Sequence, residues 1–345
     1  MKKQPHPWKS VLACVGAVIG AGFVSGREIC GFFTRYGEAS WGLILLAAAT
    51  MVFLCAMCMR RAQREQAACW CGLRCFSGTG TGALARGCVT ALMLVIGGAM
   101  VSAAGRLVEL LWPSPLAYPA GAAGTLVLAW LLGFRGAGPL AAVSGVLTAL
   151  LAGMTLALLR QPGTEAVVLR TEAASGGLLL GAIRAVGYGS MNMAVAIGVI
   201  CRAEGNERDC RCCDRRAMGT GLVLTGLLFG ANGLYLRHPG LWQEDFPIVR
   251  LFQHLRRPGY VLCAALLYLA VLTTLTATLY TLRAELDSRG ARPALSALLT
   301  LGLPLAVSAM GFAGIVDGLY TPVGLCCLGL VFLPMLFSGG KPRHA

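Results

Sequence analysis

Charged side chains are scarce in this sequence. Of its 345 residues, 13% are Asp, Glu, Lys or Arg, 57% are hydrophobic, and the mean hydropathy is +0.70. A soluble domain must cover its surface with polar side chains, so this composition excludes one of the ordinary kind. Apolar runs of about 18 residues or more recur along the whole length, and such runs predict transmembrane helices.

Histidine is also rare, and the common catalytic motifs are missing. The four histidines lie in the tails or in predicted loops, which argues against a membrane metal site built on imidazole. The chain has no G-x-S-x-G nucleophile motif, no Walker phosphate loop and no H-E-x-x-H zinc motif. We therefore expect no enzyme, with no catalytic residue, no bound metal and no cofactor.

What the sequence does contain is a series of ten candidate spans. We therefore expect an all-α polytopic membrane protein that forms a single membrane domain over residues 1–345. The spans are predicted at residues 10–34, 39–59, 86–112, 117–134, 138–159, 176–200, 217–236, 259–282, 293–312 and 315–337.

Basic residues outnumber acidic ones by 29 to 15, which gives a net charge of +14. Such a charge points to a polyanion partner only until the charges are placed along the chain. With the N-terminus inside, most of the Lys and Arg residues fall in segments on the cytoplasmic side, which is the positive-inside bias. We therefore expect both termini in the cytoplasm, contact with the lipid bilayer, and no nucleic-acid partner.

The first span carries an unusual glycine pattern. Residues 16–28 read GAVIGAGFVSGRE, so that four glycines are followed directly by Arg27 and Glu28. Glycine in a helix interior costs about 0.5–1 kcal/mol relative to alanine, and charged side chains within lipid usually mark a functional site. Irregular backbone at membrane depth is tolerated where it is buried in protein or lines a polar cavity. We expect this helix to break near Gly20–Gly26.

The same pattern recurs later in the chain. Residues 181–190 (GAIRAVGYGS) match residues 16–25 (GAVIGAGFVS) at four of ten positions without a gap. The copies lie in spans 1 and 6, and an offset of five spans reverses the direction across the membrane. This predicts an inverted repeat with halves at 10–159 and 176–337, and with broken helices 1 and 6 side by side at a substrate site. The alternative is that these small residues let helices pack closely.

Four segments carry a resemblance to a known family. They are GAGFVSGREICGFFTRYG in span 1, GYGSMNMAVAIGVI in span 6, AVLTTLTATLY in span 8 and GLYTPVG at span 10. The chain resembles the YkvI family of bacterial membrane proteins, which is similar to the amino acid–polyamine–cation transporter superfamily. The resemblance implies a LeuT-like fold of five plus five inverted spans in a bacterial inner (cytoplasmic) membrane. Arg27 departs from the Gln that is usual in that family.

The two breaks form the predicted substrate site. Unwound backbone exposes N–H and C=O groups, and the ends of half-helices direct their dipoles into the cavity. No carboxylate is expected at the centre of the break, so a cationic substrate would lack a counter-ion there. The candidate residues are Gly20, Ala21, Gly22, Phe23, Ser25 and Gly26 in span 1, and Gly187, Tyr188, Gly189, Ser190 and Asn192 in span 6.

A threonine-rich stretch in span 8 is the candidate ion site. In LeuT-like transporters, hydroxyls at this place and carbonyls of the first break hold Na⁺, a hard cation that needs oxygen ligands. The resemblance therefore implies a coupling Na⁺ held by Thr273 and Thr274 with the carbonyls of Gly16 and Ile19. The alternative is that these threonines only hydrogen-bond to their own helix backbone.

Four charged residues near the outer side are the candidate gate, namely Arg27, Glu28, Arg184 and Asp317. The resemblance implies that Arg27 and Asp317 close the outer side of the cavity, because an arginine fork suits a carboxylate and pairing relieves part of the cost of burial. The alternatives are a static structural pair, or a pair between Arg27 and Glu28.

Two cysteine clusters lie in predicted cytoplasmic loops, CWCGLRC at residues 69–75 and CRAEGNERDCRCCDRR at residues 201–216. A reducing cytosol disfavours structural disulfides, and neither cluster has the C-x-x-C pairing of common zinc sites. We expect free, solvated thiols there, with a metal or redox role as the alternative.

These features together predict a secondary active transporter of a small polar or zwitterionic solute, of the amino acid or amine type. The transporter would be coupled to Na⁺ or H⁺ and would alternate access around broken helices 1 and 6. The alternative is a ligand-sensing membrane receptor on the same fold that does not transport, similar to subunits of spore-germinant receptors.

Overall fold

The computed structural model describes residues 7–64, 80–134, 146–147, 149–150, 153, 177–203, 210–253 and 257–337. This part of the chain is helical and contains no strand. The helices and helical turns are α1 (Pro7–Val18), α2 (Ala21–Ser25), α3 (Arg27–Phe32), η1 (Thr34–Ala39), α4 (Ser40–Arg64), α5 (Gly80–Leu111), α6 (Ala117–Gly133), α8 (Gly177–Ala203), α9 (Cys210–Leu236), η3 (Pro239–Leu241), α10 (Pro247–Gln253), α11 (Arg257–Ser288), α12 (Pro293–Ser308), α13 (Phe312–Gly318), α14 (Tyr320–Cys327), the π-helical turn η4 (Leu328–Phe332) and α15 (Leu333–Phe337).

Six helical segments of the described chain are long and apolar enough to cross a membrane, and a bent pair of helices would make a seventh. The chain is therefore a multi-pass helical membrane protein, but the predicted count of ten is not confirmed. Most of the predicted span 138–159 lies outside the described residues. The six segments are Thr34–Ala62, Gly82–Leu111, Gly177–Gly198, Cys212–Leu236, Gly259–Ser288 and Tyr320–Phe337.

The first span is broken, as its glycines predict. Helix α1 ends at Val18, and Gly20 has an extended backbone (φ −94°, ψ −176°) before α2 begins. A second interruption follows at Gly26, which has the left-handed φ of 86° that glycine adopts most readily. A Cβ at Gly26 would also overlap the Tyr235 ring and hydroxyl, so the neighbouring helix α9 demands glycine at the same place.

The sixth span is not broken. Helix α8 runs without interruption from Gly177 to Ala203, so the predicted break at Gly187–Asn192 is wrong. The glycines of this segment serve close packing on both sides of the helix. A Cβ at Gly189 would lie 3.0 Å from the carbonyl oxygen of Ala47 in α4, and one at Gly187 would lie 3.2 Å from that of Thr321 in α14. The alternative of small residues at helix contacts therefore holds for this span.

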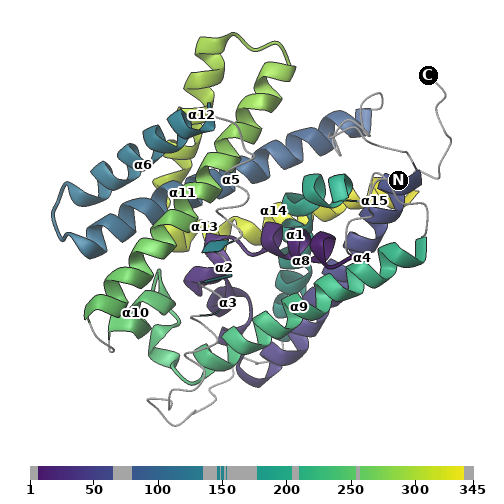
Figure 1. Cartoon of the computed structure of the whole chain (residues 1–345), viewed down its shortest axis with the longest axis horizontal. Coiled ribbons are helices and arrows are strands. Elements are labelled where there is room, and N and C mark those ends of the chain that lie inside the picture. Colours follow the sequence, from purple (N-terminus) through teal and green to yellow (C-terminus); the bar gives the residue numbers. More distant parts are fainter. Residues whose placement is uncertain are drawn as a thin grey trace.

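The long helices form two groups. Helices α1, α4, α8 and α9 pack against one another, and α5, α6, α11 and α12 form the second group (Figure 1). The short pieces of the broken span lie between the two groups, because α3 contacts α8 and α9 while α2 contacts α11 and α10. Helix α14 also contacts both groups, through α8 and α5. The break in span 1 therefore lies where the two groups meet.

The last two predicted spans are divided differently in the structure. Helix α12 ends at Ser308, and α13 leaves it at an angle of 89° after Gly311, whose φ is 76°. The tenth predicted span, 315–337, then consists of the end of α13 followed by α14, η4 and α15. This bend places α13 against α3, which brings the charged residue of α13, Asp317, to the broken span.

The second cysteine cluster is partly helical. Helix α9 begins at Cys210, seven positions before the predicted span, and Cys213 is buried, so this part of the cluster is not the solvated loop that we expected. The described residues contain no group of three metal-ligating side chains. The first cluster, at residues 69–75, lies outside the described residues.

Candidate functional site at the break in the first span

The backbone of the break is buried and locally irregular. The amide of Gly20 donates to the carbonyl of Val18, only two residues back, at 3.0 Å, and helical bonding resumes where Val24 N donates to Gly20 O at 3.2 Å. All five residues of α2 are buried, including the side chain of Phe23. The carbonyl end of α1 therefore meets the amide end of α2 inside the protein, where such dipole ends act on whatever lies beside them.

Two predicted substrate ligands serve the local backbone instead. Ser25 Oγ donates to Gly22 O at 2.7 Å and accepts from Arg27 N at 3.2 Å, which stabilises the turn at Gly26. In α8, Ser190 Oγ donates to Val186 O at 2.8 Å, one turn back in its own helix. The structure brings the two predicted segments together, since α1 and α3 both contact α8, but these hydroxyls face their own backbone.

Tyr188 of α8 packs against the third piece of the broken span. Its ring packs against Phe32 and Phe33, with centroids 5.0 and 5.2 Å away. Its buried hydroxyl lies beside the amide of Asn192 and makes no hydrogen bond of good geometry in the described part of the chain. Asn192 Nδ2 instead donates to the carbonyl oxygen of Tyr188 at 2.9 Å. A buried hydroxyl without a bond is available to a further group.

Glu28 does not lie where the sequence placed it. Instead of pairing with Arg27 in an outer gate, its side chain turns back onto the break, so that a Cβ at Gly22 would overlap the Glu28 carboxyl. The carboxyl also acts electrostatically on the hydroxyls of Tyr188 and Tyr320. The expectation of a break without a carboxylate is therefore wrong. The left-handed turn at Gly26 lies between the two residues, and the Glu28 side chain lies against Gly22.

Arg27 holds three segments together. Its guanidinium forms an ion pair with Asp317 in α13 and donates to the carbonyls of Trp242 at 3.2 Å and Glu244 at 3.3 Å. The Arg27 side chain is 9% exposed and that of Asp317 is 35% exposed. A Cβ at Gly31 would lie 2.8 Å from the Asp317 carboxylate, so glycine at that position admits the pair. The structure therefore joins two of the four predicted gate residues.

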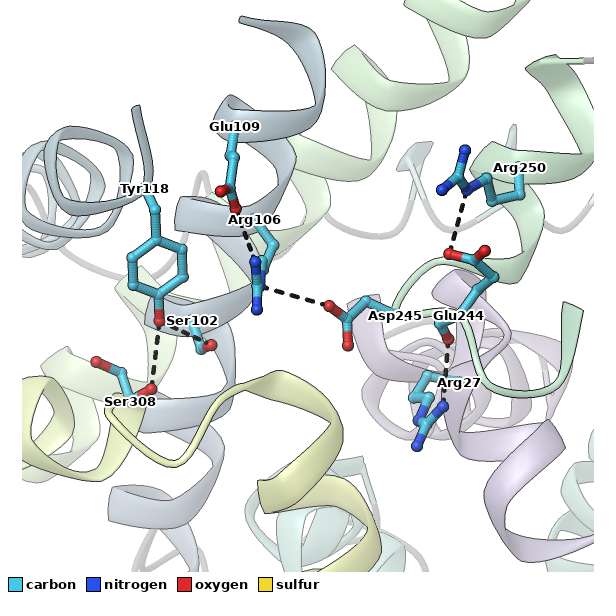
Figure 2. A network of polar contacts seen from close by, with 9 residues as sticks. All are labelled: Arg27, Ser102, Arg106, Glu109, Tyr118, Glu244, Asp245, Arg250 and Ser308. Atoms are coloured by element: carbon cyan, nitrogen blue, oxygen red, sulfur yellow. Dashed lines mark hydrogen bonds and ion pairs between the residues drawn. The ribbon is translucent and has the colours of Figure 1, made fainter. Parts of the chain in front are cut away.

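The loop that Arg27 contacts is itself held by further ion pairs (Figure 2). Arg250 Nε lies 3.1 Å from Glu244 Oε2, and Arg106 Nε in α5 lies 3.6 Å from Asp245 Oδ2. Arg106 also pairs with Glu109 at 2.9 Å, one turn along its own helix. The loop at residues 242–245 thus connects the broken span to the second helix group. Sequence reasoning missed it, although two adjacent acids shortly after a His-Pro-Gly turn were a visible signal.

A second part of the network ties the second group together. Tyr118 Oη in α6 lies 3.1 Å from Ser102 Oγ in α5 and donates to the carbonyl of Ser308 at the end of α12, at 3.3 Å (Figure 2). These bonds join α5, α6 and α12 beside the bend that leads to α13. Partly buried hydrogen bonds therefore hold together the helices that precede α13, the helix of Asp317.

The remaining predicted residues are less closely tied to the break. Arg184 is partly exposed and forms no ion pair within the described residues, so it does not join the pair of Arg27 and Asp317. Thr273 Oγ1 donates to Ala270 O at 3.0 Å, and Thr276, Thr278 and Thr281 also bond to their own helix. Helix α11 contacts α2 just after the break, but a Na⁺ site there stays a prediction.

The fold is similar to that of known membrane transporters. No family model and no curated protein sequence matches the chain. Among solved structures it resembles Mhp1, a nucleobase-cation-symport-1 family transporter, in a closed conformation with bromovinylhydantoin bound. The two chains share 15% identity over 94% of this chain and 75% of that chain, and the TM-score is 0.61. The inward-facing conformation of Mhp1 gives 16% identity over 93% and 73% of the two chains, with a TM-score of 0.64.

A manganese transporter of Eremococcus coleocola, in a mutant form, is also similar in structure. It shares 14% identity over 97% of this chain and 72% of that chain, with a TM-score of 0.51. These likenesses show that the chain has the fold of this group of transporters, which is the LeuT-like architecture that the sequence predicts.

Proposed function

We propose that this chain is a secondary active transporter of a small polar or zwitterionic solute, of the amino acid or amine type, coupled to Na⁺ or H⁺. The observation that carries the proposal is the partly buried contact of Arg27 with Asp317 and the loop at 242–245, directly beside a buried break in a transmembrane span. Charged groups are costly within a membrane protein and commonly mark pathways. The transporter fold of the chain supports the same conclusion.

The proposed topology is that of ten spans in a bacterial inner membrane, with both termini in the cytoplasm and the whole chain as one membrane domain. Residues 10–159 and 176–337 form the two inverted halves. The break in span 1 is retained as the centre of the solute site, while α8 contributes a continuous wall that carries Tyr188. Rocking of one helix group against the other would expose the break first to one side and then to the other.

The ion pair of Arg27 and Asp317 is proposed to close the outer side of this site. Asp317 is partly exposed and Arg27 is buried, so an opening movement separates the pair at its exposed end. Loss of the pair leaves Arg27 without its carboxylate partner in the closed state, which favours the open one. The loop at 242–245 would then remain with α5, since Arg106 of α5 also holds it.

A labelling experiment tests the gate. A cysteine at Ser25, just inside the ion pair, is reacted from the outside with a membrane-impermeant thiol reagent, in the parent and in Asp317→Asn. We expect Asp317→Asn to raise the labelling rate roughly ten-fold, which corresponds to about 1.4 kcal/mol. Labelling of the same protein without the Ser25 substitution measures the reaction of the native thiols, which is subtracted. Asp287→Asn, which removes an exposed ion pair with Arg283 in α11, is the matched control. Unchanged labelling in Asp317→Asn would contradict the gate.

The transport proposal itself needs a solute. Amino acids and amines that raise the unfolding temperature of the purified protein, with or without Na⁺, are the first candidates, because a bound ligand stabilises the folded state. Each is then offered to proteoliposomes under an inward Na⁺ or H⁺ gradient. We expect accumulation that collapses when the gradient is dissipated. A ligand that stabilises the protein but is neither accumulated nor exchanged would instead identify a sensing receptor.

The Na⁺ form of the proposal rests on the threonines of α11. Thr273 and Thr274, with the carbonyls of Gly16 and Ile19, remain the proposed ligands, and packing of α11 against α2 supports the placement. Alanine at both threonines should abolish any stabilisation by Na⁺. If the parent protein is insensitive to Na⁺, this ion site is wrong and coupling to H⁺ remains.

A further inference from the structure

Glu28 is a buried carboxyl with no cationic partner. The residue is 7% exposed and forms no ion pair in the described part of the chain. The adjacent Arg27 directs its guanidinium to Asp317 and to two loop carbonyls instead. The proposed solute site, gate and Na⁺ site do not use this carboxyl, although it lies directly over the break.

The groups around Glu28 are hydroxyls. The elements packed against α3 are α2, η1, α8, α9 and α13, and α14 follows α13 directly. Tyr188 of α8 and Tyr320 of α14 interact with the Glu28 carboxyl, and both are about 1% exposed.

Further ionisable groups lie on the elements packed against α3. The hydroxyl of Tyr235 in α9 lies against Gly26, and Cys30 sits on α3 itself. Asp317 of α13 is held by Arg27, and the turn η1 adds Arg35 and Glu38. No cation therefore balances Glu28 within the described residues.

An ionised carboxylate in such surroundings costs several kcal/mol unless a cation balances it. A bound proton removes this cost and needs no additional volume. A larger cation would need space beside the carboxyl, and the contact with the Gly22 backbone closes that side. A protonated carboxyl can also donate to a hydroxyl, and within the described residues the Tyr188 oxygen makes no hydrogen bond of good geometry.

We propose that Glu28 is a proton-binding site, which holds H⁺ while the Arg27–Asp317 pair is closed and releases it to water when that pair opens. The step transfers one proton between the carboxyl and water, and no other bond is formed or broken. The second part of this proposal, release of H⁺ on opening (the release half), rests on the proposed transport function and names H⁺ as its coupling ion. The first part, binding of H⁺ in the closed state (the binding half), does not depend on transport, because it concerns the closed protein alone.

Infrared difference spectroscopy of the purified protein tests the binding half without any solute. The carbonyl stretch of a protonated carboxyl lies well apart from carboxylate bands, so a pH titration reports each buried acid that gains or loses a proton. We expect one such band in the parent, loss of that band in Glu28→Gln, and its retention in Glu38→Gln, an exposed acid on η1. A band that persists in Glu28→Gln, or is missing from the parent at every pH, would overturn the proposal.

Isotope labelling keeps the test valid even if Glu28→Gln fails to fold. Carboxyl-¹³C glutamate in the otherwise unchanged protein should shift the band, and labelled aspartate should not. A shift with aspartate alone would assign the proton to Asp317 or another aspartate and refute the site at Glu28. Solute accumulation in proteoliposomes is scored separately, so a missing band with intact transport refutes only the proton site, and a Glu28 band without transport refutes only the transport function.

Discussion

Two ten-residue segments of this chain share four identical positions and adopt different structures. Residues 16–25 are interrupted at Gly20 and again just beyond, at Gly26, whereas residues 181–190 lie inside the uninterrupted helix α8. Ser25 bonds across a turn to Gly22 O, while its counterpart Ser190 bonds one helical turn back to Val186 O. A glycine lowers the cost of both a break and a close helix contact, so the neighbours decide which one forms.

The neighbours of the two segments differ in kind. In span 1, the Tyr235 side chain occupies the space over Gly26, and the Glu28 side chain covers Gly22. In α8, the backbones of α4 and α14 approach Gly189 and Gly187. An intact helix without side chains at these two positions lets the neighbouring backbones come this close. Beside Gly22 and Gly26 the nearest atoms belong to side chains, whereas beside Gly187 and Gly189 they include backbone carbonyl oxygens of α14 and α4.

The largest predicted effect concerns the contact that keeps α8 continuous. A Cβ at Gly324 in α14 would overlap the backbone carbonyl of Gly187, which cannot move without moving the helix. Gly324→Ala should therefore lower the free energy of unfolding by about 3 kcal/mol, as overpacking does. Gly302→Ala, in the exposed face of α12, meets nothing within 4 Å and is the control. Equal unfolding temperatures in detergent for the two variants would contradict the backbone contact.

The next effect concerns the second interruption of span 1. Gly26→Ala imposes a side chain on a φ of 86° and pushes it into Tyr235, so we expect a loss of about 2 kcal/mol. Tyr235→Phe removes the hydroxyl nearest to the new Cβ and should recover part of the loss in the double variant. Gly198→Ala, inside α8 with open space around it, should be neutral or slightly stabilising. A destabilised Gly198→Ala would contradict the open space around that position.

The smallest effect separates the two serines. Ser25→Ala removes a hydroxyl that both donates and accepts in the turn at Gly26, and should cost about 1 kcal/mol. Ser190→Ala removes a bond to its own helix, which contributes little, and should leave the unfolding temperature nearly unchanged. If the two variants unfold alike, the serine of the break does not stabilise its turn, and a role in solute binding gains weight.

Several features of the site were visible in the sequence. The lengths of the apolar runs indicated a helical membrane protein, because a span needs about 20 apolar residues whatever its neighbours are. The cluster of glycines before Arg27 indicated the break in span 1, and the similarity of four segments to a transporter-like family indicated the LeuT-like fold. Arg27 and Asp317 were named as partners from that resemblance, and the structure brings them together.

Other features were decided by tertiary structure alone. The continuity of α8 depends on backbones that approach it from α4 and α14, and no local pattern records that approach. The direction of the Glu28 side chain depends on the left-handed turn at Gly26. The contact of Arg27 with the loop at 242–245 joins residues more than 200 positions apart. Hydropathy and glycine content are local properties that determine where a helix can break, whereas packing between distant segments determines where it does.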